Sequence, residues 1–415
     1  MWYRVNSQVV LRVAPGGPDG PFATHLRSFA DSLIQQGYCR HYVQRQVMLA
    51  AGFSRWLKEK GVPRHRIASE HPIRYLRYRH RQRRPNQGDA ASLGHLMAFL
   101  RSAKAIRPAT TLTPQVTPVE RCTQAYEEYL REERALAKAT IVYYVPFVRS
   151  FLKSCFGSGP VKLSGMSAKD VIRFVQCQAR RLHLKRAKVM TTALRSFLHY
   201  ARYRGEIHLD LSSVVPSVAN WSMPSIPRGI APDQVRRLLG QIDRRNAVGR
   251  RDYAILLLLA RLGLRSGEVA FLELEDIDWK AGCLNVRSKG GGRTQLPLPK
   301  DVGDAIVAYL RHGRPRSTSR RVFLRAKAPI RGFLSQCAIG TIVRHAIQRT
   351  GVSAPTTGAH QFRHGLATQM LHRGASLGEI GDLLGHTSPE TTKIYTKVDL
   401  GALRTLALPW PRDVR

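Results

Sequence analysis

Acidic residues are scarce in this sequence. Its 415 residues include 28 Asp and Glu against 67 Lys and Arg, which gives a formal net charge of +39 at pH 7. Residues 1–110 hold 19 basic and 5 acidic groups, residues 111–227 hold 17 and 8, and residues 228–415 hold 31 and 15. A folded chain that is basic throughout is typical of proteins that bind nucleic acid, so we expect all three parts to touch the same polyanion.

Long hydrophobic runs and a leader peptide are also absent. The longest purely apolar run, residues 254–260, is too short to cross a hydrocarbon core about 30 Å thick. The first four residues, Met-Trp-Tyr-Arg, do not begin a signal peptide. We therefore predict a cytoplasmic protein without membrane contact. The content of 43% hydrophobic and 23% charged residues is that of a globular protein and excludes a disordered chain.

Cysteine is sparse, and its spacing excludes the common metal motifs. No two cysteines form a CxxC pair, and no pair of histidines follows them at zinc-ligand spacing. We predict free, buried thiols and neither a metal ion nor another cofactor. The six residues are Cys39, Cys122, Cys155, Cys177, Cys283 and Cys337.

Helical periodicity of the apolar residues dominates the first half of the chain. It predicts a basic helical N-terminal domain (residues 1–110) that binds additional DNA or a partner, and a second helical domain (111–215) that binds DNA. Stretches rich in proline at 108–118 and 214–229 are interpreted as linkers. The expected helices span 22–37, 42–61, 74–84, 93–107, 119–134, 139–156, 167–182 and 185–204.

The pattern changes after the second linker. Residues 228–400 alternate between helical segments and short β-type segments, so we predict a third domain that contains a small antiparallel sheet, followed by a C-terminal tail at 401–415. The fold class is therefore mostly α-helical with a small β-sheet. The expected strands span 277–279, 283–287 and 294–298, and the expected helices span 232–242, 249–262, 301–311, 335–350, 359–373, 376–384 and 389–398.

Two short motifs of the third domain place a cation at a sharp turn. Arg265 lies between Gly263, a natural helix end, and Ser266, a possible cap of the next helix, with Glu268 close enough to support it. A guanidinium on a rigid corner suits a phosphate, although a surface ion pair with Glu268 explains the pattern equally well. Lys289 precedes three glycines between two expected strands, where it either reaches a ligand or solubilises a hairpin tip.

Four further residues follow at or near the starts of expected helices. His360 and Arg363 are three residues apart and share one helix face, which suits a phosphate. His386 follows a Leu-Gly helix end, and Tyr395 lies about two turns into the next helix. Each residue alone also fits a structural role. Together, two Arg, two His, one Lys and one Tyr in a basic chain are the groups that phosphodiester transfer without a metal requires.

The order of these residues resembles that of the tyrosine recombinase (phage integrase) family. The sequence Gly-Leu-Arg-x-x-Glu at 263–268 matches its first motif, His-x-x-Arg at 360–363 and Leu-Gly-His at 384–386 match its second, and a tyrosine follows nine residues later. Phe362 replaces the leucine usual in the family. Residues 119–205 resemble the helical core-binding domain of the family, and the C-terminal sequence resembles recombinases of bacterial mobile elements that encode several such enzymes.

The resemblance implies a reaction and a role for each residue. Tyr395 would attack the scissile phosphate of double-stranded DNA and form a 3′-phosphotyrosyl link, while Arg265 and Arg363 neutralise the developing charge. His386 would donate a hydrogen bond to a non-bridging oxygen of the phosphate. His360 would accept the proton of the tyrosine, and Lys289 would act as the general acid that protonates the 5′ oxygen. It also implies a C-shaped clamp around DNA, a tetramer on paired sites, and sister recombinases as further partners.

Two other functions remain possible from the sequence. A type IB topoisomerase shares this chemistry but relaxes supercoils without a partner site. A DNA-binding accessory protein with a silent site is the other alternative, and the complete set of six catalytic positions argues against it. The main prediction is a site-specific recombinase, metal- and ATP-independent, that integrates, excises or transposes a bacterial mobile element and resides on the nucleoid.

Overall fold

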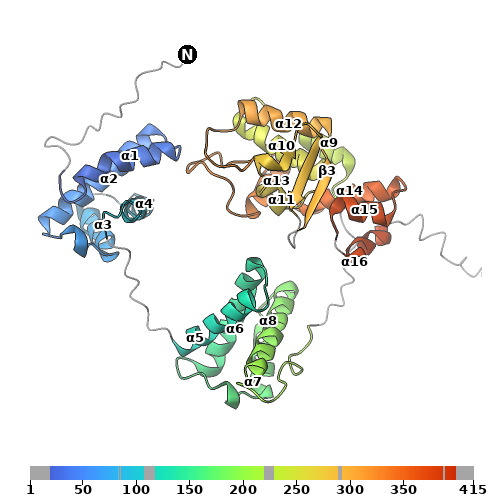
Figure 1. The fold of residues 1–415 in the computed structure, drawn as a ribbon, viewed down its shortest axis with the longest axis horizontal. Helices are drawn as coiled ribbons and strands as arrows, with labels where there is room; N and C mark the ends of the chain where they lie inside the picture. Colours follow the sequence, from blue (N-terminus) through green and yellow to red (C-terminus); the bar gives the residue numbers. More distant parts are fainter. Residues whose placement is uncertain are drawn as a thin grey trace, which may run out of the picture. The chain divides into compact units, whose positions relative to one another are not determined.

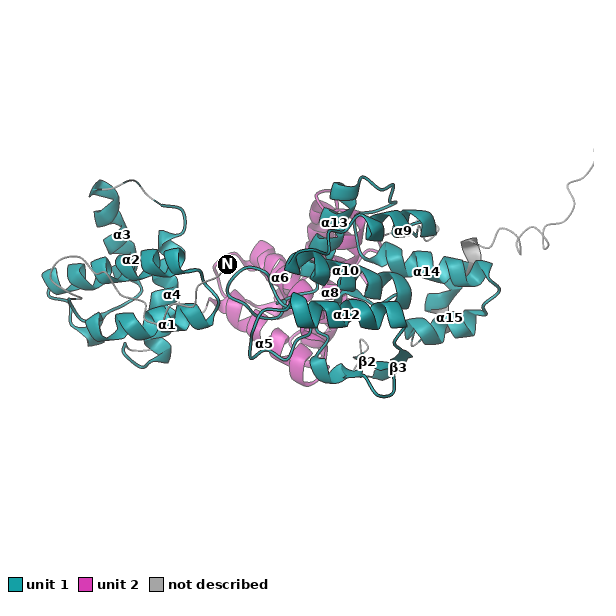
Figure 2. Ribbon diagram, turned by 90° about the horizontal axis from the view of Figure 1, so that it is seen from above, with its two compact units in different colours: residues 1–108, 224–415 teal, residues 109–223 magenta. Residues whose placement is uncertain are grey.

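A computed structural model describes residues 19–82, 84, 86–106, 117–218, 229–287, 292–386 and 388–398. The chain divides into two compact units, one formed by residues 1–108 and 224–415 and the other by residues 109–223 (Figure 2). No helix in the described ranges is long and apolar enough to cross a membrane.

The first helical part (Figure 1) has its own apolar core, to which all four of its described α-helices contribute. Within this core Tyr75 is only 4% exposed and packs against the rings of Phe53 and Trp56. The elements are η1 (Ala23–His25), α1 (Leu26–Gln35), α2 (Arg40–Glu59), η2 (Arg64–Arg66), α3 (Glu70–Gln82) and α4 (Asp89–Ser102).

The second unit is a four-helix domain with a separate core. Two of its helices begin at capping boxes, in which the side chain of Glu120 accepts the Thr117 N–H and that of Asp170 accepts the N–H of Ser167. The helices are α5 (Pro118–Glu132), α6 (Lys138–Phe156), α7 (Ala168–Ala179) and α8 (Leu184–Tyr203), with η3 (Leu163–Gly165) between α6 and α7.

The part that begins at residue 229 combines helices with one small sheet. The first elements are α9 (Pro232–Gly240), α10 (Ala247–Leu262), α11 (Ser266–Ala270), η4 (Leu274–Asp276), β1 (Ile277–Asp278), β2 (Cys283–Arg287) and β3 (Arg293–Pro297). They are followed by α12 (Lys300–His312), α13 (Cys337–Thr350), α14 (His360–His372), α15 (Leu377–Leu384), α16 (Pro389–Thr392) and η5 (Lys393–Val398).

The sheet is antiparallel, as the sequence predicted, and its strand order is β1-β2-β3. Leu284 is the register partner of both Ile277 and Leu296, and all three side chains are buried in the same core. The alternation of buried and exposed residues along β2 therefore puts one sheet face against the helical core that α10 supplies.

Three expectations need correction. The predicted helix at 389–398 is one turn of α16 followed by the 3-10 segment η5. Ser266 does not cap α11, because Arg265 holds the cap position. The six cysteines are free, but none is buried: Cys39, Cys177 and Cys337 are exposed and the other three are half-buried.

Candidate active site

The site is built where two helices end against each other. α10 ends at Gly263 and α15 ends at Gly385, and both glycines adopt a left-handed φ of 59°. A Cβ atom on Gly263 would lie 2.8 Å from Cδ2 of Leu384 and 3.1 Å from Cδ2 of Leu366. Glycine is thus required at 263 both for its backbone conformation and for the close approach of α14 and α15.

Arg363 links these two helix ends. Its guanidinium donates to the carbonyl oxygen of Gly263 at 2.8 Å and to that of Leu384, and the residue is only 3% exposed. The last carbonyls of a helix carry partial negative charge and lack partners within the helix, so a buried cation is favourable there. The same contacts fix the direction of the guanidinium from two sides.

Arg265 is held in the same way at the start of α11. Glu268 accepts the backbone N–H of Arg265 and one guanidinium N–H, both at 2.7 Å, and the guanidinium also donates to the carbonyl of Gly385 at 3.3 Å. The side chain of Glu268 is 7% exposed, whereas that of Arg265 is 30% exposed. Glu268 therefore lies where the sequence predicted a supporting carboxylate, and Arg265 keeps an accessible edge.

His386 follows directly after the left-handed turn at Gly385. Its backbone N–H donates to the carbonyl of Gly381, and its ring Nδ1 lies 2.7 Å from Oγ1 of Thr392. Thr392 is 2% exposed, and a Cβ on Gly381 would lie 3.2 Å from the same hydroxyl. The hydroxyl of Thr392 thus fixes the imidazole and leaves Nε2 available to a ligand. Sequence analysis did not single out Thr392.

Tyr395 lies in η5 and is almost completely enclosed. It is 1% exposed and shares a small apolar cluster with Ala367, Ile380 and Leu384. Its hydroxyl lies 3.0 Å from Nδ1 of His364, a residue to which the sequence analysis gave no role.

His360, the predicted acceptor of the tyrosine proton, lies one turn before His364 on α14. Its ring centroid is 5.1 Å from that of His364. The spacing of four residues between the two histidines was the available sequence signal for such a pair.

Burial and the two arginines keep the histidines neutral. Desolvation, followed by nearby positive charge, lowers the pKa of His386 and of His364 to about 4 and also lowers that of His360. Burial, followed by the charge of Arg265, lowers the pKa of Arg363 to about 10. The resulting set is an anion-binding pair of guanidinium groups, neutral imidazoles and one phenol.

Five of the six predicted catalytic residues are therefore gathered in one place. The positive charges of Arg265, Arg363 and His360 all lower the pKa of His386, and those of both arginines partly offset the rise that burial causes in the pKa of Tyr395. Lys289 is not among the described residues. In the ranges that the structure describes, no group of three His, Cys, Asp or Glu side chains is arranged to hold a metal ion.

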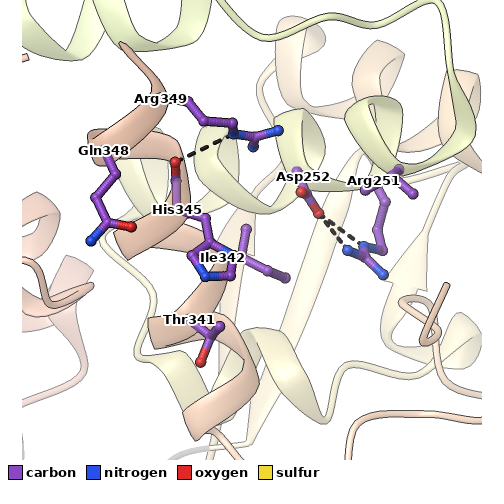
Figure 3. A pocket seen from close by; sticks show the side chains of 8 residues that line it. Arg251, Asp252, Thr341, Ile342, His345, Gln348 and Arg349 are labelled. Carbon is purple, nitrogen blue, oxygen red and sulfur yellow. Dashed lines mark hydrogen bonds and ion pairs between the residues drawn. The ribbon is translucent and has the colours of Figure 1, made fainter. Parts of the chain in front are cut away.

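A separate cavity of about 470 Å³ lies between α10 and α13 (Figure 3). It is lined in part by the buried pair of Arg251 and Asp252, whose atoms approach to 2.7 Å, and by Arg349. Arg251 also donates to the carbonyl of Leu324, so this pair ties α10 to a distant loop. None of the described candidate residues lines this cavity, and we interpret the pair as structural.

Comparison with protein families and known proteins gives consistent matches. The model of the phage integrase family matches residues 228–401, and that of the phage integrase N-terminal SAM-like domain matches residues 123–205. The chain is 54% identical over 415 residues to y4rA of Sinorhizobium fredii, named as an integrase/recombinase, and covers all of both chains. It is 31% identical to the tyrosine recombinase XerD of Mycobacterium tuberculosis over 68% of this chain and 94% of XerD.

A solved structure has the same fold. The XerH site-specific recombinase, in a post-cleavage complex with palindromic difH substrate, superposes with a TM-score of 0.55 over 70% of this chain and 85% of that chain. The sequences are 20% identical, so this likeness concerns the fold. The described helices α1–α4 lie before both family matches.

Proposed function

Because the chain belongs to the tyrosine recombinase (phage integrase) family, whose enzymes cleave and rejoin DNA at specific sites, we propose that the cluster around Tyr395 is its active site. Tyr395 attacks the scissile phosphorus and forms the 3′-phosphotyrosyl link, which conserves the energy of the broken bond. Rejoining therefore needs no ATP. The observation that carries the proposal is the pair of fixed guanidinium groups, Arg265 and Arg363, beside a buried phenol.

The other side chains take part in charge and proton handling. The neutral ring of His386 accepts from Thr392 at Nδ1, so Nε2 carries the proton and donates to a non-bridging oxygen. Glu268 positions Arg265. Lys289 is the proposed acid on the 5′ oxygen, and His360 is the proton acceptor that the resemblance implies. The contact between Tyr395 and His364 bears on which histidine accepts the tyrosine proton.

We further propose a setting for this chemistry. The protein acts on a bacterial mobile element in the cytoplasm, on double-stranded DNA, as a tetramer on paired sites, with sister recombinases as additional partners. The DNA complex would be a C-shaped clamp formed by domains 111–215 and 228–400. The supporting observations are the excess of basic residues in every part of the chain and the recombinase names of its relatives.

Covalent trapping tests the proposal. Nicked duplexes from around the gene of this protein lose a short strand after cleavage, so a phosphotyrosyl adduct accumulates. We expect an adduct that resists denaturant with the wild-type protein and with Tyr253→Phe, a control tyrosine in α10, and none with Tyr395→Phe. Relaxation of supercoils by a monomer without site preference would favour a topoisomerase. Tight binding without any adduct would favour the accessory protein.

The N-terminal helices offer a second DNA contact. On α3, Tyr75 faces the core, while Arg74, Arg77 and Arg81 follow one exposed face at helical spacing. Arg74 has only a solvent-exposed partner, Glu70, at 3.8 Å, and Arg77 and Arg81 have no acidic partner among the described residues. An exposed helix with unpaired guanidinium groups suits the phosphates and the major groove of DNA. We propose that α3 binds DNA outside the cleavage site.

The salt dependence of DNA binding tests this second contact. The double variant Arg77→Ala/Arg81→Ala should lose roughly two phosphate contacts. The slope of log affinity against log salt concentration should therefore be shallower than for the wild-type protein, and the protected footprint should be shorter. Cleavage of the core site on short duplexes should stay unchanged. Arg27→Ala with Arg40→Ala removes the same charge from exposed positions of α1 and α2 and serves as the control. Equal effects from both pairs would contradict a specific role for α3.

A further inference from the structure

The phenol of Tyr395 has one hydrogen-bond partner among the described residues, and that partner is His364. The distance from the hydroxyl oxygen to Nδ1 is 3.0 Å, and the two rings meet edge to face with centroids 5.7 Å apart. The phenol is held there by its apolar neighbours in η5, α14 and α15. Two independent contacts, one polar and one aromatic, thus join the proposed nucleophile to this ring.

His360 lies behind His364 in this arrangement. The two rings are one helical turn apart on α14, tilted by 35°, with centroids 5.1 Å apart. In the described structure the contact of His360 is with the ring of His364 and not with the tyrosine hydroxyl. The ring closest to the hydroxyl proton is therefore the second histidine of the His-Gln-Phe-Arg-His segment at 360–364.

We propose that His364 is a further catalytic residue, whose Nδ1 accepts the proton of the Tyr395 hydroxyl as the phenol oxygen attacks the scissile phosphorus. The bond from the tyrosine oxygen to phosphorus forms while the bond from phosphorus to the 5′ oxygen breaks. The phenol proton passes to Nδ1, and the 5′ oxygen takes a proton from Lys289. Rejoining reverses each transfer. This inference rests on the proposed function and moves the proton-accepting role from His360 to His364.

The protonation state of the free enzyme suits this role. An imidazole must be neutral to accept a proton, and burial, followed by the charges of His360 and Arg363, lowers the pKa of His364 to about 4. The groups that face this ring are His360 and Arg363 from α14, Tyr395 from η5, and His386 after α15. A DNA phosphate brings negative charge among them, which favours the protonated ring when the proton arrives.

Single-turnover cleavage of the nicked duplex by His364→Asn tests the assignment. Asparagine places an amide where Nδ1 lies and can hold the hydroxyl, but it is not a base. We expect unchanged DNA affinity, a rate about 100-fold lower at pH 7, and recovery of the rate as the pH rises toward ionisation of the phenol. A merely structural role would not produce this pH dependence. His364→Gln is the second variant if thermal unfolding shows that the shorter amide destabilises the fold.

Two chemical rescues separate proton removal from proton donation. Site-specific 3,5-difluorotyrosine at 395 ionises more readily and should restore cleavage by His364→Asn but not by Lys289→Ala. A duplex with sulfur at the 5′ bridging position needs no proton on its leaving group, and it should restore Lys289→Ala but not His364→Asn.

The controls separate this proposal from the proposed function. If wild-type protein forms an adduct while His364→Asn cleaves at the wild-type rate, only the role of His364 is overturned. If His360→Asn alone shows the loss and its recovery at high pH, the proton acceptor is His360. Absence of an adduct with wild-type protein would instead reject the proposed function.

Discussion

At the residue scale, the site depends on side chains that fix other side chains. Arg363 is oriented by two helix-end carbonyls, Arg265 by Glu268, and His386 by Thr392. All of these contacts are made within the protein, so its own groups set the direction of the guanidinium groups and of the imidazole. Such preorganisation is what makes electrostatic stabilisation of a transition state effective.

Replacement of Thr392 tests this support. Thr392→Val keeps the shape of the side chain but removes the hydroxyl beside Nδ1 of His386. We expect cleavage to slow roughly ten-fold, which corresponds to the loss of one hydrogen bond worth about 1.4 kcal/mol, with unchanged DNA affinity. Thr391→Val, at the exposed neighbouring position, should cleave normally. Equal rates for both variants would show that Thr392 does not orient the ring.

The sequence singled out the candidate catalytic residues and one support, Glu268, but not the other supports. Arg265, Arg363 and Tyr395 belong to spaced motifs that can be read along the chain. Thr392 and the contact between His364 and Tyr395 depend on the turn at Gly385, which brings α16 and η5 against α14 and α15. Thr392 lies 6 residues from His386, and His364 lies 31 residues from Tyr395. No local sequence pattern specifies pairs at these separations.

At the scale of elements, α14 is positioned by a backbone crossing that admits no side chain. The segment at 229–230 passes over α14, and a Cβ on Gly365 would lie 2.6 Å from the carbonyl oxygen of Ile230. A Cβ on Gly229 would lie 2.3 Å from the backbone of Gly365. Most helix boundaries, by contrast, were predictable within a few residues from periodicity and caps. The exceptions are α3 and α4, which each begin four residues earlier than predicted, and η5, which tightens into a 3-10 segment.

Two helical glycines should respond in opposite ways to alanine. Gly365→Ala inserts a methyl group into the crossing and should lower the melting temperature and the cleavage rate together. Gly340→Ala, in the interior of α13 with no atom within 4 Å of its would-be Cβ, should raise stability by about 0.5–1 kcal/mol. Thermal unfolding measures both. A stable and active Gly365→Ala protein would contradict the account of how α14 is placed.

At the scale of the whole molecule, the neutral histidines link stability to pH. The pKa values of His364 and His386 are about 4 in the folded protein, below their ordinary value of 6.5, so the unfolded chain binds more protons between these values. Their contribution to stability is complete above pH 6.5 and is lost as the pH falls toward 4. The melting temperature should fall in that window, and less steeply for the double variant His364→Asn/His386→Asn. Parallel curves for the two proteins would contradict this linkage.

The central claim concerns one atom, the hydroxyl oxygen of Tyr395. The most direct measurement is mass spectrometry of the tryptic peptide that carries the trapped DNA strand after nuclease digestion. The account predicts a nucleotide on the peptide Ile-Tyr-Thr-Lys at 394–397, joined through its tyrosine. A nucleotide on any other peptide would show that the buried phenol beside His364 is not the nucleophile.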